Sequence, residues 1–424
     1  MNFDHLKQQD PEVYHIIVDE IERQNEGVEL IASENLVSNS VLEATGSHLT
    51  NKYSEGYAGK RYYAGNEFID KSEELAIARA KLLFGAEHVN VQPHAGSQAN
   101  MEAYFALLNL KDKILGMKLD HGGHLTHGSP VNFSGKFYTF SSYGVDKETG
   151  RINYDEVAEI AQKEQPKLLL SGASAYPRTI DFKRFQKIAE EVGCYHMADI
   201  AHISGLIAAK LHPDPVSVCD VITTTTHKTL RGPRGAIIMS KKEDRLKPDG
   251  KKNLAQKIDS AVFPGMQGGP LDHVIAAKAV AFGEALKPAF PVYQKQVIVN
   301  AQAMAKTLLD KGITLVSGGT DNHLLLLDVS ALGIGGKTAE KALETAGIYC
   351  NKNMIPHDSR SPFDPSGIRI GTPAMTTRGF KEDASQEIAE IISNVLHNPK
   401  DDDILTKSRK RVTELCKEYP IYKD

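Results

Sequence analysis

One lysine, Lys228, stands where an expected strand ends, and this place suits covalent chemistry. The run from Asp220 to Thr226 is rich in β-branched residues and predicts a buried strand, and the Gly- and Pro-containing segment after Lys228 predicts a turn. A lysine amine at such a point packs poorly in a core but is well placed to form a Schiff base with a carbonyl. The alternative is a surface lysine at the end of an edge strand, and Lys228 alone does not separate the two interpretations.

Three other segments supply the partners that a phosphorylated aldehyde cofactor needs. Gly96 and Ser97 follow an expected strand and open a helix, whose free N–H groups suit a phosphate. Asp199 ends another strand, where it could face a protonated ring nitrogen or only cap the next helix. The glycine-rich loop 263–270 could bring a second stretch of backbone to a phosphate. Together with Lys228, these segments predict pyridoxal 5'-phosphate, an electron sink.

Three histidines, at positions 121, 124 and 127, raise the question of zinc. The two glycines between His121 and His124 favour a loop over a rigid helical face, and no cysteine ligand is adjacent in the sequence. A flat imidazole stacked on the cofactor ring suits this loop better. We therefore predict no metal.

The elements that must position these residues alternate between strand and helix. Short buried strands are expected at 89–91, 113–117, 167–170, 195–197, 221–226 and 236–239. Strands interleaved with helices indicate an α/β fold with a mostly parallel sheet, whose ligands gather beyond the carboxyl ends of the strands. After about residue 275 the pattern predicts a smaller α/β domain, with strands at 313–316, 323–329 and 368–369. The expected domains are therefore 1–275, an N-terminal arm with a large cofactor-binding domain, and 276–424.

Helix signals are clear at several points. Asp10-Pro11 predicts a helix start, and Gly193 predicts the end of a helix that begins near Phe182. Apolar residues recur at helical spacing from Ile388 to Leu396. The three aspartates at 401–403 read as a solvated loop.

Composition limits the classes of function. The chain has 424 residues, 41% hydrophobic and 25% charged, and a formal net charge of -4, which disfavours nucleic acid as a partner. No stretch approaches the ~20 apolar residues that span a bilayer, so no membrane association is expected. Four scattered cysteines without metal-ligand spacing fit a reducing compartment. We expect a cytoplasmic metabolic protein.

Several long motifs, taken together, resemble serine hydroxymethyltransferase. They agree in order along the chain between about residues 28 and 380, and lie at 30–35, 51–63, 90–100, 120–128, 223–235 and 366–373. The resemblance implies an aminotransferase-like enzyme of pyridoxal-phosphate fold type I. It also implies a homodimer with active sites shared between subunits, or a tetramer.

The resemblance also implies roles for individual residues. Lys228 would be the Schiff-base lysine, Asp199 the partner of the pyridine nitrogen, and His124 the ring stacked on the cofactor. Glu55 would be the acid/base at the substrate hydroxymethyl group, and Arg369 would bind the substrate carboxylate. The cofactor would further contact Gly96, Ser97, Ser174, His202 and His227, with Gly268 and Gly269 reaching it from the neighbouring subunit. Serine or folate would further contact Ser33, Tyr53, Tyr63, Leu119, Gly123, Leu125 and Asn353.

The implied reaction is the reversible transfer of the hydroxymethyl group of L-serine to tetrahydrofolate, which gives glycine and 5,10-methylenetetrahydrofolate. Two alternatives are a pyridoxal-phosphate threonine aldolase without folate and a non-catalytic cofactor-sensing regulator. The block from Glu55 to Tyr63 disfavours the aldolase, and no basic helix-turn-helix segment supports the regulator.

Overall fold

The computed structural model of the chain describes residues 3–422. Contacts between residues group the chain into two units, one of residues 40–295 and one that joins residues 1–39 to 296–424. We describe each unit by itself. The domain limits expected from the sequence, 1–275 and 276–424, remain a prediction.

The larger unit is built on a seven-stranded sheet in the order β4-β10-β9-β8-β7-β5-β6. All neighbouring pairs from β9 to β6 are parallel, whereas β10 runs antiparallel to both β9 and β4. The expected α/β class with a mostly parallel sheet is confirmed. The strands are β4 (His88–Asn90), β5 (Lys113–Met117), β6 (Thr139–Tyr143), β7 (Leu168–Ser171), β8 (Tyr195–Asp199), β9 (Val221–Thr225) and β10 (Ala236–Ser240).

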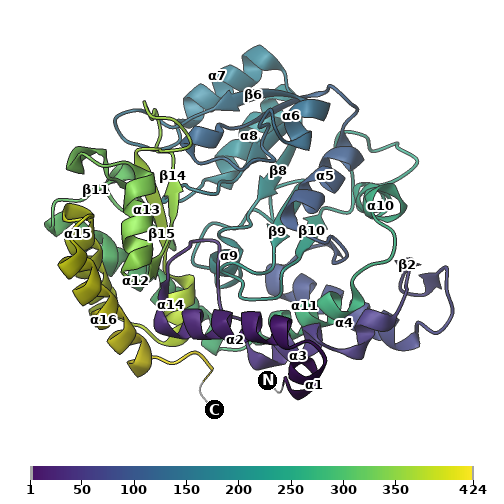
Figure 1. Ribbon diagram of the computed structural model, residues 1–424. Coiled ribbons are helices and arrows are strands. Elements are labelled where there is room, and N and C mark those ends of the chain that lie inside the picture. Colours follow the sequence, from purple (N-terminus) through teal and green to yellow (C-terminus); the bar gives the residue numbers. More distant parts are fainter. Residues whose placement is uncertain (1–2, 423–424) are drawn as a thin grey trace. The chain divides into compact units, whose positions relative to one another are not determined.

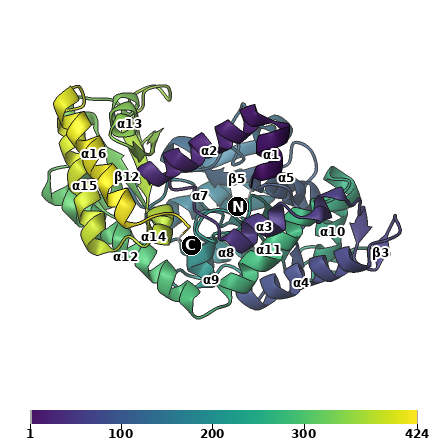
Figure 2. The same cartoon turned by 60° about the horizontal axis from the view of Figure 1, so that its bottom comes forward.

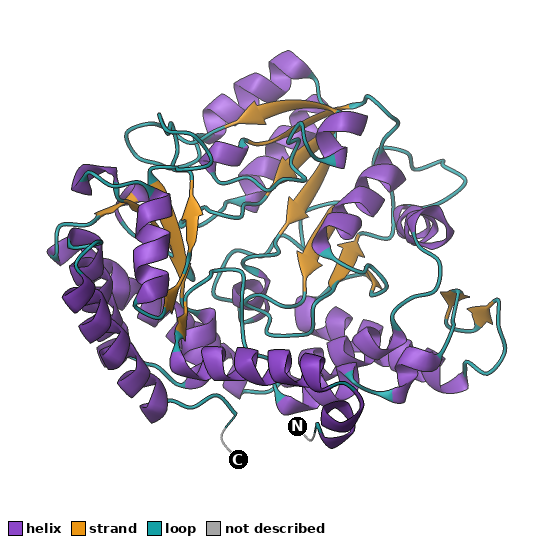
Figure 3. Ribbon diagram, viewed as in Figure 1, coloured by secondary structure: helices purple, strands orange, loops and turns teal. Residues whose placement is uncertain are grey.

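Helices cover this sheet, as the purple ribbons around its orange strands show in Figure 3. Helix α5 contacts β9 and β10, while α7 and α8 contact strands β5 to β8 (Figure 1). The helices are α4 (Glu67–Phe84), α5 (Gly96–Leu107), α6 (Phe133–Phe137), α7 (Tyr154–Glu164), α8 (Phe182–Val192), α9 (Ser204–Ala208), α10 (Leu254–Ser260) and α11 (Asp272–Ala285). A hairpin of β2 (Gly56–Tyr57) and β3 (Lys60–Arg61) precedes α4, and α3 (Asn39–Thr45) and α12 (Ala289–Asp310) cross the unit limits in sequence.

Local signals explain where these elements begin and end. The side chain of Asp181 accepts hydrogen bonds from the N–H groups of Lys183 and Arg184, which caps α8. Gly193 ends that helix in the left-handed region at φ 70°, as predicted. Every residue of β7 and β9 is buried, because helices cover both faces of a parallel sheet. The sheet is therefore a rigid base for the loops at its carboxyl edge.

The smaller unit has an antiparallel sheet in the order β11-β12-β15-β14 and a separate parallel pair, β1 with β13. Helices α15 and α16 pack side by side (Figure 2). Its elements are α1 (Asp4–Gln9), α2 (Pro11–Glu26), β1 (Val28–Glu29), β11 (Thr314–Leu315), β12 (Leu324–Asp328), α13 (Gly336–Thr345), β13 (Ile348–Tyr349), β14 (Asn351–Asn353), β15 (Gly367–Gly371), α14 (Pro373–Arg378), α15 (Glu382–His397) and α16 (Asp402–Glu418).

The structure corrects one helix signal and confirms another. The aspartates at 401–403 are not a solvated loop: Asp401 caps α16 by accepting from the N–H groups of Asp403 and Ile404, and the helix starts at Asp402. The predicted helix start at Asp10-Pro11 is confirmed, since Asp10 accepts from Val13 N at 3.1 Å. Among the described residues, no helix is both long and apolar enough to traverse a bilayer.

Candidate active site

Lys228 lies in a tight turn between the antiparallel strands β9 and β10, three residues past the end of β9. Two backbone hydrogen bonds close this turn, from Thr226 N to Gly235 O at 3.0 Å and from Gly232 N to Thr226 O at 2.7 Å. Lys228 is only 8% exposed. The turn therefore holds the base of a mostly buried lysine at the carboxyl edge of the sheet.

Asp199 ends the adjacent strand β8, whose register pairs it with Thr223 of β9. One carboxylate oxygen accepts from Asn100 Nδ2 at 2.9 Å and lies 3.2 Å from His127 Nε2, and the other accepts from Ala201 N at 3.1 Å. Burial alone would raise the pKa of this carboxyl group. The hydrogen bonds from His127 and Asn100, together with the electrostatic interaction with both histidine rings, outweigh it, so the pKa lies well below its usual range.

Asn100 links Asp199 to the rest of the site. Its Nδ2 also donates to Thr126 Oγ1 at 2.7 Å, and its Oδ1 accepts from Thr223 Oγ1 at 2.6 Å. Asn100 lies one helical turn after Gly96 on α5. Asn100, Thr126, Thr223 and His127 have no assigned role in the sequence prediction, and the only signal for Asn100 is its i+4 spacing from Gly96.

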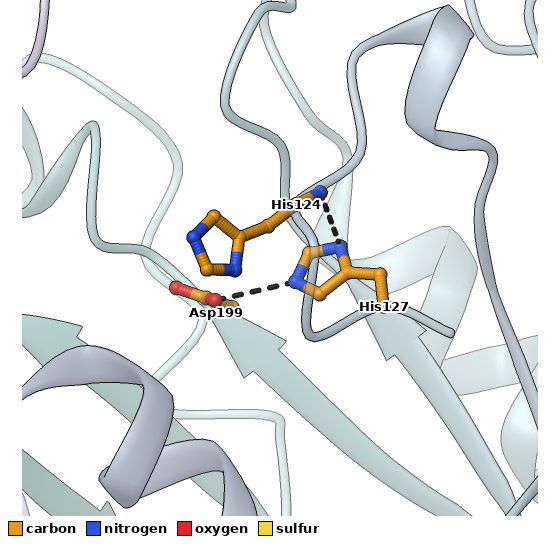
Figure 4. A group of neighbouring side chains, drawn as sticks. All are labelled: His124, His127 and Asp199. Carbon is orange, nitrogen blue, oxygen red and sulfur yellow. Dashed lines mark hydrogen bonds and ion pairs between the residues drawn. The ribbon is translucent and has the colours of Figure 1, made fainter. Parts of the chain in front are cut away.

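The histidine loop brings His124 and His127 against Asp199 (Figure 4), with the two ring centroids 5.8 Å apart. The loop needs Gly123, since a Cβ there would lie 2.3 Å from Met117 O. Leu119 and Leu125 flank this glycine and are half exposed. The loop thus presents an imidazole and two apolar side chains at the strand edge.

Asp120 precedes His121 in the sequence, but the acidic residue that the fold brings to His124 and His127 is Asp199. The candidate ligand atoms of His124, His127 and Asp199 lie within 4.8 Å of one another. The hydrogen bonds of His124 and His127 indicate which ring nitrogen of each carries a proton. His127 Nδ1 accepts from His124 N at 3.3 Å, and His124 Nδ1 accepts from Thr126 N at 3.2 Å. In the neutral tautomers that follow, both Nε2 atoms carry a proton. His127 therefore acts as a donor to Asp199, an arrangement that differs from a set of metal ligands.

The predicted phosphate turn lies at the start of α5. A Cβ on Gly96 would come 2.7 Å from Thr225 Cγ2, so only glycine lets this helix begin against the end of β9. Ser97 follows on the exposed side of the first turn. The helix N-terminus thus lies at the same sheet edge as Lys228.

Three further predicted contacts follow the neighbouring strands β7, β8 and β9. Ser174 N donates to Gly122 O at 2.7 Å, which ties the segment after β7 to the histidine loop. The carbonyl oxygen of His202 accepts from Thr229 Oγ1 at 2.9 Å, beside Lys228 in sequence. Burial and the charge of Lys228 lower the pKa of His227 to about 3, so His227 is neutral.

A second group of predicted residues lies on the loop before α4. Tyr53 Oη donates to Glu55 Oε1 at 3.2 Å, and the rings of Tyr53 and Tyr63 meet edge to face at 5.2 Å. A Cβ on Gly268 would lie 2.9 Å from Glu55 Oε1, and a Cβ on Gly269 would lie 3.1 Å from the Tyr53 ring. The loop that carries the acid and the glycine loop are therefore packed together.

A buried arginine fixes the backbone on both sides of Glu55. Arg61 Nη1 donates to Ser54 O at 3.0 Å and to Gly56 O at 2.9 Å. Glu73 balances its charge through a 2.7 Å ion pair. The position of Glu55 is thus set by buried polar contacts even though it lies in a loop.

The remaining predicted residues belong to the smaller unit. Arg369 lies in β15, its Nε donates to Asn351 Oδ1 at 3.0 Å, and burial lowers its pKa to about 10, so it stays cationic at neutral pH. Asn353 lies in β14 opposite Gly367. Ser33 lies in the segment after β1.

The chain was compared with models of known protein families. A family model described as serine hydroxymethyltransferase matches residues 6–392, which is most of the 424-residue chain.

Proposed function

The chain belongs to the serine hydroxymethyltransferase family, and from this premise we propose that the cluster around Lys228 and Asp199 is its active site. The protein is a pyridoxal-phosphate-dependent transferase that moves a hydroxymethyl group between serine and glycine, with tetrahydrofolate as co-substrate. The threonine aldolase alternative is not favoured. The observation that carries the assignment of the site is the carboxylate of Asp199, which is 11% exposed and contacts His127 and Asn100, on the strand next to the one that leads to Lys228.

The residues of the cluster fit the cofactor. Asp199 is held as a carboxylate by His127 and Asn100, which suits a protonated pyridine nitrogen, and Gly96 opens a helix where no Cβ is tolerated. When bound, the cofactor supplies an aldehyde for covalent attachment of an amine and a ring that withdraws electrons.

Asp199 would hold the protonated nitrogen of the cofactor ring, because its own low pKa keeps it a carboxylate. His127 and Asn100 fix the direction of the carboxylate. His124 would hold the cofactor ring, and its Nδ1 contact with Thr126 sets the orientation of the imidazole. Burial keeps His227 neutral, so this residue adds no charge beside Lys228.

Arg369 binds the carboxylate of the amino acid. Asn351 fixes the plane of its guanidinium group through Nε. A carboxylate held by a planar fork is fixed in orientation, and that orientation selects which bond at Cα breaks. Ser33 and Asn353, in the same unit, line the substrate site with it.

Glu55 moves the proton at the hydroxymethyl oxygen of serine, and Tyr53 positions its carboxylate through their hydrogen bond. Tyr63 would lie near the substrate carboxylate with Ser33, and Leu119, Gly123 and Leu125 would line the substrate site. The hydroxymethyl carbon then passes to the folate.

We further propose a homodimer in which the Glu55 loop and the Gly268-Gly269 loop serve the partner's site. Exposed apolar side chains support this. Phe68, Leu75 and Leu82 are 70%, 44% and 73% exposed and follow one another at seven-residue spacing along α4. A large exposed apolar face marks an interaction surface, and α4 directly follows the Glu55 loop. The four cysteines are buried and free, which is consistent with a cytoplasmic location.

An assay of glycine formation from serine tests the reaction. Turnover should require both pyridoxal phosphate and tetrahydrofolate. Equal glycine formation without folate would contradict the hydroxymethyltransferase assignment. Reduction of the holoenzyme with borohydride, followed by peptide mapping, tests the site, because the label should lie on Lys228. A label on any other lysine would refute the assigned cluster.

A further inference from the structure

The segment between β4 and α5, residues 91–94, is held by a buried lysine. Lys278 on α11 is 1% exposed, and its Nζ donates to Val91 O at 2.6 Å, to Pro93 O at 3.1 Å and to Ala236 O at 2.8 Å. Buried carbonyl groups outside strands and helices need such partners. One ammonium group therefore joins the approach to α5 to the first residue of β10.

A second side chain holds the remaining polar groups of the same segment. Gln267 Nε2 donates to Gln92 O at 2.9 Å, and Gln267 Oε1 accepts from His94 N at 3.0 Å. The side chains of Gln267 and Lys278 thus order the backbone of four successive residues, 91–94, which end two positions before Gly96.

The same lysine touches the turn that carries Lys228. A Cβ on Gly235 would lie 2.6 Å from Lys278 Cε, and Gly235 O closes the Lys228 turn by accepting from Thr226 N. The Lys278 side chain therefore contacts both residues 91–94, which lead to the Gly96–Ser97 turn, and Gly235 at the end of the Lys228 turn.

The three carbonyl acceptors around Lys278 Nζ match the protonated form of the lysine. An ammonium group has three N–H bonds, whereas a neutral amine would turn a lone pair toward one of the carbonyls. Burial lowers the pKa of Lys278 to about 7, and the negative charges of Glu102 and Glu73 oppose this shift. Burying an ammonium costs more free energy than burying an aliphatic side chain, so packing alone does not explain a lysine here.

We propose that Lys278 is a positioning residue for the cofactor phosphate, which acts with Gln267 by setting the path of backbone 91–94 and so the direction of the Gly96–Ser97 turn. This inference rests on the proposed function only in placing the phosphate at that turn. Lys278 does not itself bind the phosphate; it acts through the backbone of residues 91–94.

The test compares the binding of pyridoxal phosphate and of pyridoxal, which lacks the phosphate, to the apoprotein by absorbance titration. Lys278→Met should weaken pyridoxal phosphate about tenfold to a hundredfold, as misplacement of a binding group by ~1 Å can. Pyridoxal affinity should not change. Lys257→Met is the matched control, because it removes a partly buried lysine that pairs with Asp244 elsewhere in the same unit, and it should leave the ratio of the two affinities unchanged.

Equal loss of both affinities, or an unchanged ratio in a folded variant, would overturn the proposal; thermal unfolding of the apoprotein reports folding. If Lys278→Met fails to fold, Lys278→Gln and Gln267→Leu replace it in the same titration, with the same expected drop in ratio. Ser97→Ala separates the two levels of inference. An unchanged ratio in Ser97→Ala would refute the phosphate site itself, whereas a lowered ratio there with unchanged ratios in the Lys278 variants would refute only the role of Lys278.

Discussion

Mixing two inactive variants tests whether the site is shared between subunits. Lys228→Ala removes the proposed covalent attachment point, and Glu55→Gln removes the proposed proton-transfer group at the hydroxymethyl oxygen while it preserves the shape of the loop held by Arg61. Alone, Glu55→Gln should bind serine with a spectral shift but transfer its hydroxymethyl group ~10²–10⁴-fold more slowly.

The expected recovery follows from the symmetry of a dimer. If Glu55 serves the partner's Lys228, a mixed dimer has one site with both changes and one site with neither. Random mixing of equal amounts makes about half of the dimers mixed, with one of two sites intact, so activity should return to about one quarter of that of the unmodified enzyme.

The assay is methylene transfer to tetrahydrofolate after the subunits are unfolded and refolded together, with two affinity tags to isolate mixed dimers. Each variant refolded alone is the control. If Glu55 instead serves the site of its own chain, every site in the mixed dimer carries one change. Activity at the level of the separate variants, in purified mixed dimers, would therefore refute the shared site.

Three further changes test single groups. Asp199→Asn should lower kcat by about 10²-fold or more, because an amide cannot neutralise a protonated ring nitrogen; near-normal kcat would leave Asp199 as a mere cap. Arg369→Lys keeps the charge but loses the planar fork, so serine affinity, measured by titration of the holoenzyme spectrum, should fall, and Arg369→Ala should weaken it by ~1.5–3 kcal/mol; unchanged affinity would move the carboxylate site elsewhere. Burial lowers the pKa of His196 to about 3 from 6.5, so below pH 6.5 only the unfolded state takes up this proton, and its contribution to stability falls by about 1.4 kcal/mol per pH unit. Urea unfolding at pH 6.5 and 5 should show a loss that is about 2 kcal/mol smaller in His196→Gln, and equal losses would contradict this assignment.

The sequence predicts the strand edge well because parallel strands end on the same side of a sheet. Lys228 and Asp199 could be assigned to adjacent strand ends from the run at 220–226 and the short strand before Asp199, and the structure pairs those strands. Apolar, β-branched runs identify buried strands. The edge strand β6 was missed because its residues, Thr139–Tyr143, are partly polar and exposed.

Contacts between distant segments could not be predicted in this way. His127 comes three residues after His124, but only the fold shows that its ring faces Asp199. Asn100 looks like any polar residue in the first turns of a helix. Lys278 would be expected on an exposed face of α11, and its burial depends on three carbonyl groups from β10 and the segment after β4.

Helix α5 fixes the spacing between two parts of the proposed site. Its first residue, Gly96, belongs to the proposed phosphate turn, and Asn100, four residues later, donates to Asp199, the proposed partner of the pyridine nitrogen. Four residues of α-helix advance about 6 Å and return to nearly the same face. The distance between the proposed phosphate turn and the residue that holds Asp199 is thus fixed by one turn of helix and does not depend on the surrounding loops. Redesign of the site for a longer or shorter cofactor would have to replace this helical turn as one unit.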